Sequence, residues 1–221
     1  MQIIKDVLSP AIEMLESGRY SEAQEWLNNF IEHEPNNAEA LSLLSQAFLL
    51  DKKLDDAKRS LSAAVRINPK LPSILQNQAR ILLKSSRKKE ALKIAQLACE
   101  KPNRDIESLL VLAACLIAND RDLESVPIIQ QILDAKPSYA EAYANRALVK
   151  YRAKDMNGAI QDAKKTLSLK PHLTHIWQLL STIQYQVGQL GHAIDALKNA
   201  CNIEPNNTDI LIQLGRLLQL D

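Results

Sequence analysis

Glycine is scarce in this chain of 221 residues, and its scarcity argues against several kinds of nucleotide site. The five glycines are scattered, at positions 18, 158, 188, 191 and 215. A loop that cradles phosphates through its backbone N–H groups places several glycines within a few residues. No phosphate-binding loop is therefore expected, and the GxSxG and HExxH motifs of hydrolases are also missing from the sequence.

The sequence also has few cysteines and a net charge close to zero, and each of these features excludes some classes of protein. The three cysteines, Cys99, Cys115 and Cys201, form no CxxC pair, which argues against a disulfide framework or a zinc site. Lys and Arg number 27 and Asp and Glu 26, so the net charge of +1 gives no basic surplus for nucleic acid or anionic membranes. No apolar run reaches the about 18 residues of a membrane span, and Lys5 and Asp6 interrupt the apolar core that a signal peptide needs. We therefore expect a cytoplasmic protein that binds no nucleic acid and no membrane.

What the chain does contain is a repeat, visible as three columns of residues that recur every 34 positions. One column is small throughout: Ala11, Ser45, Ala79, Ala113, Ala147, Ser181 and Gly215. A second column is also small: Ala23, Ala57, Ala91, Ser125, Ala159 and Ala193. A third is large and apolar: Val7, Leu41, Leu75, Leu109, Tyr143, Trp177 and Leu211. Because a larger side chain would overpack a close helix crossing, the small columns predict the same helix joints along the whole chain.

Proline closes each repeat. Prolines lie at positions 35, 69, 102, 137, 171 and 205, and only Pro102 is out of step, by one residue. Each period contains two helical apolar patterns, and the proline stops the second helix before the turn into the next period. The sequence thus predicts stacked antiparallel helix pairs, with Asn37, Ser138 and Thr174 as candidate N-caps of first helices.

The sequence resembles the tetratricopeptide repeat family, whose unit has 34 residues and a Trp, Leu-Gly, Tyr, Ala, Phe, Pro pattern. The residues that carry the resemblance are Gly18, Tyr20, Ala23 and Pro35, then Tyr143, Ala147, Ala159 and Pro171, then Trp177, Gly188, Ala193 and Pro205. The resemblance covers the whole chain and implies one all-α domain over residues 1–221, an α-solenoid that winds as a right-handed superhelix. The expected units are 4–37, 38–71, 72–105, 106–139, 140–173 and 174–207, followed by 208–221 as the first helix of a seventh.

Two prolines and one arginine depart from the pattern. Pro10 stands inside the first helix, which we expect to restart at Ser9 or to kink. Pro127 stands early in the second helix of the fourth unit, which we expect to begin at or after about Ser125 or to bend. Arg146 occupies a usually apolar position, so we expect looser packing in the fifth unit.

No constellation of residues indicates catalysis, a cofactor or a metal. His172 and His175 could share a metal ion, but they flank a predicted helix start and lack a cysteine or carboxylate partner, which favours solvated turn residues. Residues 85–90, SSRKKE, form a basic cluster in a predicted turn; a solvated loop is favoured over a docking patch for an acidic partner. We expect a protein that is not an enzyme and needs no cofactor.

The remaining candidate site is a surface. The first helices of a stacked solenoid line a concave face, where the resemblance implies binding of peptides or partner helices. The helical phase selects Leu43, Gln46, Leu50, Asn77, Arg80, Lys84, Val111, Ala114, Asn145, Tyr151 and Arg152. We expect Arg80, Lys84, Asn145 and Arg152 to contact a partner through side-chain donors. Because this face is otherwise largely apolar, coverage by the protein's own terminus or by a second copy is the alternative.

Two specialised peptide sites of the family are not reproduced. The carboxylate clamp of chaperone-tail readers has Lys and Asn in its first unit, where this chain has Lys5 and Ser9. The asparagine ladder of repeat-bearing protein glycosyltransferases is only partial, because Asn77 and Asn145 are separated by apolar residues. We therefore expect a non-catalytic scaffold for a peptide or protein segment. The alternative is the recognition arm of a longer enzyme, of the glycosyl- or sulfotransferase type, whose catalytic domain is absent from this chain.

The last predicted helix carries a second apolar surface. Leu211 and Gly215 fit the repeat columns and are expected to pack on the preceding helix. Ile210, Leu214 and Leu217 then fall on an exposed side. Exposed side chains of this size forgo about 1.5–3 kcal/mol each, which favours a native chain that continues past residue 221 or a homodimer through this helix.

Overall fold

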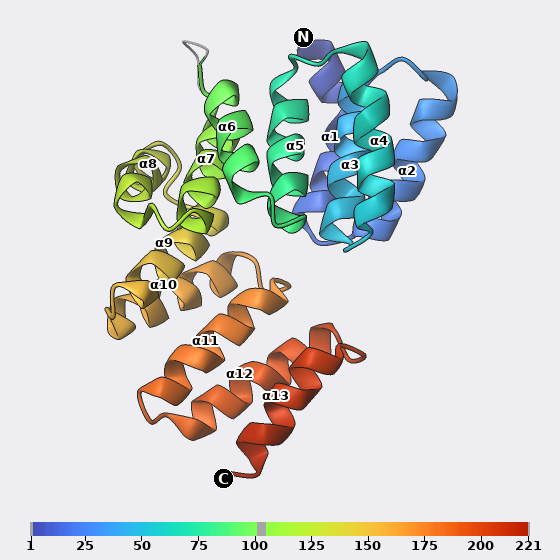
Figure 1. The fold of residues 1–221 in the computed structure, drawn as a ribbon. Helices are drawn as coiled ribbons and strands as arrows, with labels where there is room; N and C mark the ends of the chain where they lie inside the picture. Colours follow the sequence, from blue (N-terminus) through green and yellow to red (C-terminus); the bar gives the residue numbers. More distant parts are fainter. Residues whose placement is uncertain (1, 101–104, 221) are drawn as a thin grey trace. The chain divides into compact units, whose positions relative to one another are not determined.

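The computed structural model describes residues 2–100 and 105–220, with side chains described from residue 7 onward. Within these residues the chain is an all-α repeat solenoid of thirteen helices without a strand (Figure 1). Pro102, the proline that is out of step, and the side chain of Lys5 lie outside the described residues. No helix of the described part is both long enough and apolar enough to cross a bilayer.

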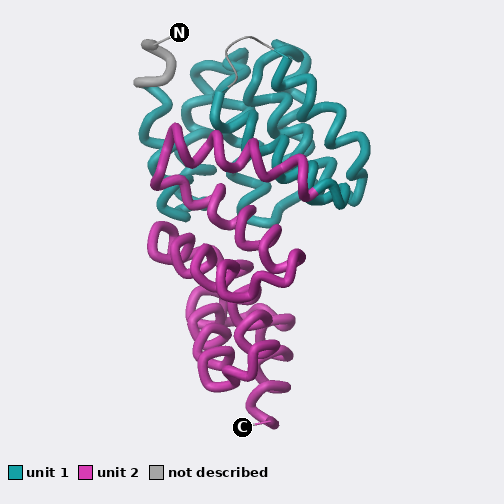
Figure 2. Tube along the Cα trace, turned by 90° about the vertical axis from the view of Figure 1, so that its left-hand side faces the viewer, with its two compact units in different colours: residues 1–121 teal, residues 122–221 magenta. Residues whose placement is uncertain are grey.

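The chain forms two compact units, residues 1–121 and 122–221 (Figure 2). The first contains α1 (Gln2–Glu16), α2 (Tyr20–His33), α3 (Ala38–Leu50), α4 (Leu54–Ile67), α5 (Pro72–Lys84), α6 (Lys88–Ala98) and α7 (Ile106–Ala118). The second contains α8 (Asp122–Ala135), α9 (Ala140–Arg152), α10 (Met156–Leu169), α11 (Thr174–Gln186), α12 (Leu190–Ile203) and α13 (Thr208–Leu218). In the first unit α3 pairs with α4 and α5 with α6; in the second, α9 pairs with α10 and α11 with α12. The predicted helix pairs are thus present in both units.

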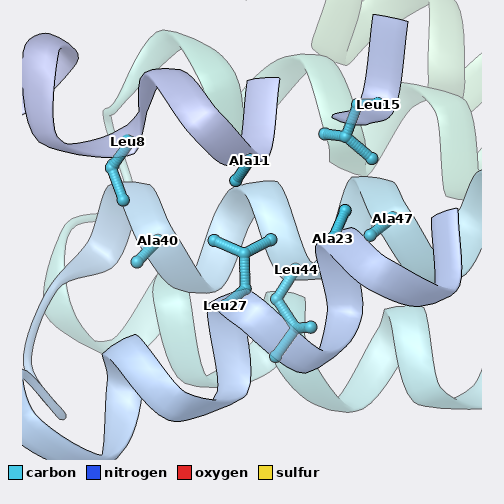
Figure 3. Packing of buried hydrophobic residues seen from close by; sticks show 8 residues of the cluster. All are labelled: Leu8, Ala11, Leu15, Ala23, Leu27, Ala40, Leu44 and Ala47. Carbon is cyan, nitrogen blue, oxygen red and sulfur yellow. The ribbon is translucent and has the colours of Figure 1, made fainter. Parts of the chain in front are cut away.

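The small columns form the joints between these helices. Every described member of the two columns except Gly215 is buried. Figure 3 shows one such joint, where side chains of α1, α2 and α3 point toward one another: Leu8, Ala11, Leu15, Ala23, Leu27, Ala40, Leu44 and Ala47. Alanines at the crossings let the helix backbones approach while the leucines fill the space between them, which confirms the reason inferred for the columns.

The turn inside each pair has the same backbone conformation six times. Residues 18, 52, 86, 120, 154 and 188, each 34 positions after the last, have positive φ angles between 59° and 79°. In the second pair, the N–H of Lys52 donates to the Leu49 carbonyl at 3.3 Å and that of Lys53 to the Phe48 carbonyl at 2.8 Å. This is the Schellman arrangement, which satisfies the last carbonyls of the first helix. Four of these positive-φ residues lie in the first unit, and Gly18 is the one glycine among them. Because glycine is the usual residue at positive φ, the sequence did not indicate that this turn recurs.

Both helices that contain an internal proline run through it, so the later starts that were one of the two expectations are not present. α1 runs through Pro10, so the restart at Ser9 is wrong, and α8 begins at Asp122, so the start at or after Ser125 is wrong. An internal proline costs about 3 kcal/mol because it removes a helical hydrogen bond and crowds the preceding turn. The carbonyl that Pro127 leaves without a helical donor belongs to Leu123, a residue 88% exposed, where water can bind it. A bend at either proline stays a prediction.

One of the three predicted N-caps is present. Asn37 caps α3 by accepting a hydrogen bond from the Ala40 N–H at 3.0 Å, as predicted. Ser138 lies one residue before the N-cap position of α9 and Thr174 is already the first residue of α11, so neither is a cap. Further side-chain caps are supplied by Asp105, Asp155 and Asn207.

The terminal helix α13 packs on the opposite side from the one predicted. Ile210 is fully buried against Leu197 and Ala200 of α12, and Leu214 and Leu217 pack against the same cluster. The exposed apolar residues of this helix and the residues after it are instead Leu211, Ile212, Leu218 and Leu220. A Cβ added at Gly215 would meet nothing within 4 Å. In the second repeat the equivalent residues, Leu41 and Ser45, face α4: Leu41 packs with Ala57 and Leu61, and the Ser45 hydroxyl donates to the Ala57 carbonyl at 2.8 Å.

Candidate interaction surface

Three rows of residues cross the first helices α3, α5 and α7 of the first unit. These helices contact one another in sequence, α3 with α5 and α5 with α7 (Figure 1). Residues 34 positions apart take equivalent places on them, so the rows are Leu43, Asn77 and Val111; Gln46, Arg80 and Ala114; and Leu50, Lys84 and Ala118. We call the surface that bears these rows the first-helix face. It gathers eight of the predicted contact residues.

Polar residues of the first-helix face are bonded to one another across the helices. The amide of Asn77 is buried and donates to the Ser42 carbonyl at 2.8 Å and the Ser42 hydroxyl at 3.0 Å. Arg80 donates to the Asn77 side-chain oxygen at 3.0 Å and forms an ion pair with Glu107. This chain of bonds connects α3, α5 and α7. Asn77 therefore connects α5 to α3 and, against expectation, its amide is not available to a partner protein. The charge of Arg80 is paired with Glu107 of the same unit.

The accessible part of the first-helix face lies where α3 and α5 end. Leu50, the last residue of α3, is 40% exposed, and Lys84, the last residue of α5, is exposed. Gln46 of α3 and Ala114 of α7 are half-buried. Val111 is buried, so its predicted place on a contact surface is not met. Leu43, half-buried, packs against the core shown in Figure 3.

The other three predicted contact residues belong to α9 of the second unit. Asn145 is half-buried, and the Tyr151 hydroxyl accepts a hydrogen bond from the Gln186 side chain at 2.8 Å. Arg152 forms an ion pair of 3.1 Å with Asp122. Like Arg80, Arg152 is thus engaged inside its own unit, which the spacing of the repeats did not indicate.

A charged cluster stands between α9 and α10, where looser packing was predicted. Arg146 donates two hydrogen bonds of 2.8 Å to Asp162, and Lys150 lies 2.9 Å from the same carboxylate. Asp162 is buried, which alone would raise its pKa, but the bonds from Arg146 and Lys150 outweigh burial and hold the pKa below its usual value. Arg146 also stacks over the Tyr143 ring, 5.1 Å from its centroid. Arg146 is thus bonded to a carboxylate of the paired helix, and the looser packing expected around it stays a prediction.

The side chains that could bind a metal or act in catalysis do not form a site in the part of the chain that the structure describes. No cluster of three or more His, Cys, Asp or Glu suited to a metal ion occurs in residues 2–100 and 105–220. All three cysteines are thiols outside any disulfide, and burial raises the pKa of Cys115 to about 12, so it stays a neutral thiol near neutral pH. Burial also lowers the pKa of His172. In the basic cluster at 85–90, Arg87 pairs with Glu90.

Comparison with known proteins gives a consistent picture. Two models of the tetratricopeptide repeat match residues 14–81 and 174–207. The crystal structure of TTC0263, a thermophilic protein of this repeat type from Thermus thermophilus, superposes with a TM-score of 0.72 at 20% identity, covering 82% of this chain and 99% of that one. The crystal structure of YrrB, described as having an unusual peptide-binding site, has a TM-score of 0.51 at 13% identity and covers 85% of this chain and 96% of that one.

Among curated sequences, the human protein O-mannosyl-transferase TMTC3 is 25% identical over 185 residues. The match covers 82% of this chain but 20% of TMTC3. The chain spans between 20% and 33% of the length of the curated relatives that it matches.

Proposed function

Because the chain belongs to the tetratricopeptide repeat family, we propose that it is a non-catalytic scaffold that binds a segment of another protein on the first-helix face. The observation that carries this proposal is the exposed end of that face, where Leu50 at the end of α3 and Lys84 at the end of the neighbouring α5 are both exposed. An apolar side chain beside a cation suits a segment with an apolar anchor and a nearby carboxylate. The hydrogen bonds from Asn77 and Arg80 support the role differently, by fixing the three helices that present the surface.

Site-specific photo-crosslinking tests the proposal. A photoreactive phenylalanine analogue at Leu50 is expected to capture a partner from an extract of the source cells. The same analogue at Ile67, the last residue of α4, is the matched control because both positions are 40% exposed and only Leu50 lies on a first helix. The captured protein is then purified and its affinity measured.

The affinity of the purified complex should change when residues of the first-helix face are substituted, and not when a residue of α4 is. We expect Leu50→Glu with Lys84→Glu to weaken binding at least tenfold, since the apolar anchor is lost and the charge is reversed. Ile67→Glu should leave the affinity unchanged. Equal capture at both positions, or equal loss of affinity, would refute the assignment of this face.

A second candidate function is a substrate-recognition arm of a longer enzyme. It is supported by the similarity to the protein O-mannosyl-transferase TMTC3, of which the matched region is one fifth. On this proposal the catalytic domain is encoded in the same reading frame, outside the 221 residues. Sequencing full-length transcripts decides the matter: an adjoining glycosyltransferase domain supports the arm, and a reading frame that holds only repeats removes it.

A further inference from the structure

The second helix of the fourth repeat, α8, carries an exposed apolar patch. Leu123 is 88% exposed, Val126 is 47% exposed, and Pro127 is exposed as well. Val126 and Pro127 follow Leu123 by three and four positions, so the three residues share one side of the helix. Because α8 is a second helix of the second unit, the patch is separate from the first-helix face.

The repeat shows that the fold does not require apolar residues at these places. The residues equivalent to Leu123 are all exposed, and each is polar or glycine: Ser21, Asp55, Lys89, Asn157 and Gly191. The residues equivalent to Pro127 are all exposed and all polar: Glu25, Arg59, Lys93, Gln161 and Asp195. Both columns thus face water in the other five repeats, and both are apolar in α8. A single exposed leucine is ordinary, but two such departures one turn apart in one helix indicate a contact surface.

Pro127 also has a cost that folding does not require. A proline inside a helix has no N–H, so the Leu123 carbonyl, four residues earlier, lacks its helical donor. The polar residues at the equivalent positions of the other repeats all have this N–H. Residues that break a local rule without a gain in stability are expected at functional sites. Here the break leaves a backbone acceptor on the residue whose apolar side chain is the most exposed of the patch.

The charges of α8 indicate which partner fits the patch. The helix contains Asp122, Glu124 and Asp134, and lysine or arginine stands only outside its ends, at positions 121 and 136. Asp122 is paired with Arg152 of α9. Two copies of α8 would bring two acidic helices together, which argues against a second copy of this chain as the occupant. A lysine or arginine beside an apolar side chain would offset the acidic charge and could donate to the Leu123 carbonyl.

We propose that α8 docks a basic amphipathic helix of a partner protein. This helix places apolar residues against Leu123, Val126 and Pro127, and a lysine or arginine beside the acidic residues of α8. Its apolar residues recur at the same spacing of three and four positions as the patch, so the two apolar stripes can pack along each other. The proposal can fail while the first-helix face binds its own partner, and the reverse also holds.

The test uses two synthetic peptides and the whole chain, isotopically labelled for NMR. The basic probe is an amphipathic peptide of leucine and lysine with about 14 residues, roughly four turns of helix. The acidic probe has glutamate at every lysine position and the same leucines. Titration with the basic probe is expected to shift the methyl signals of Leu123 and Val126. The acidic probe should bind about tenfold more weakly, because its charge has the same sign as that of α8.

Two variants separate the patch from general stickiness of exposed apolar residues. Leu123→Asn with Pro127→Gln copies Asn157 and Gln161 of the next repeat and should abolish binding of the basic probe. Because this double variant removes a proline from a helix interior, it should be at least as stable as the unmodified chain, so lost binding is not unfolding. Leu97→Asn is the matched control, since Leu97 is 46% exposed on another second helix, α6, and should leave the affinity unchanged.

Several results would overturn the proposal. These are no shifts at Leu123 and Val126 with millimolar basic probe, shifts that survive the double variant, or equal loss of affinity in Leu97→Asn. Equal or tighter binding of the acidic probe would remove the basic partner. Shifts of the same methyl signals on concentrating the chain without a probe would assign the patch to a second copy instead. Leu50→Glu with Lys84→Glu should change none of these results, so failure at this patch is distinguishable from failure of the first-helix face.

Discussion

At the scale of single residues, a polar side chain at a usually apolar repeat position depends on what stands opposite it on the paired helix. Arg146 and Lys150 of α9 both face Asp162 of α10, and all three groups are bonded. The signal for this cluster was in the sequence, because Arg146 and Asp162 depart from the repeat pattern together. One departure suggests a packing defect, but two at facing positions indicate a pair.

Removal of the Asp162 carboxylate should destabilise the second unit. We expect Asp162→Ala to lower the free energy of unfolding by about 1–3 kcal/mol, less than for a fully buried pair because Arg146 and Lys150 are partly exposed. Since the folded pKa of Asp162 is lowered, its contribution is present above the ordinary value near 3.8 and is lost as the pH falls through the folded value. Urea unfolding at pH 7 and at pH 3 measures both effects.

A double variant controls for the loss of packing in this experiment. Arg146→Leu combined with Asp162→Ala recreates the pairing of Leu180 with Ala196 in the next repeat. It should recover part of the stability lost by Asp162→Ala, because no arginine is left facing an apolar neighbour. If Asp162→Ala is as stable as the unmodified chain at pH 7, the cluster contributes nothing and this account is wrong.

At the scale of the element, the recurring turn between paired helices sets where each first helix ends. Its left-handed residue appears at each of six equivalent positions, although only Gly18 and Gly188 are glycines. The side chains at the other four must be tolerated at a cost of about 1 kcal/mol each. The packing of the pair thus imposes a backbone conformation that local propensity disfavours.

A matched pair of glycine substitutions tests this. An added Cβ meets nothing within 4 Å at either Gly188 or Gly215, so only backbone preference differs between them. Gly188 has a φ of +78°, and we expect Gly188→Ala to destabilise the protein by about 1 kcal/mol. Gly215 lies inside α13, and Gly215→Ala should stabilise it by about 0.5–1 kcal/mol. Thermal unfolding followed by circular dichroism gives both values, and shifts of the same sign would contradict the prediction.

At the scale of the whole molecule, each helix pair of a repeat solenoid is completed by its neighbours along the chain, and α13 packs against α12. The buried side of α13 completes the preceding pair through Ile210, Leu214 and Leu217. Its other side exposes Leu211 and Leu218, which are 46% and 50% exposed. The sequence analysis expected a second copy to bind at Ile210, Leu214 and Leu217. Since those residues pack against α12, we now expect any self-association at Leu211 and Leu218.

Two double variants of α13 should have different effects. Leu211→Glu with Leu218→Glu should abolish concentration-dependent association in sedimentation experiments and leave the unfolding free energy nearly unchanged, because both side chains are half in water. Leu214→Glu with Leu217→Glu should instead lower stability by several kcal/mol, because charges would be buried against α12. A protein that is monomeric at high concentration before any substitution would remove self-association from this account.

The sequence by itself determined the repeat, the helix pairs and the joints between them. These features depend on the size of residues at fixed intervals, and size alone decides whether two helices can approach, so Ala79 or Ala193 could be placed in the core without coordinates. The same pattern identified which helix comes first in each pair.

Only the tertiary structure decided which of those surface residues are engaged within the fold. Asn77 and Arg80 were predicted to lie on a contact surface, but in the structure they are bonded to Ser42 and Glu107 of the neighbouring helices α3 and α7. It also decided which side of α13 is covered, and it left the side-chain oxygen of Gln184 buried without a hydrogen-bond partner. The periodic pattern gives each residue its direction, whereas a hydrogen bond also requires a donor and an acceptor to meet within about 3 Å across two helices, and only their packing fixes that distance.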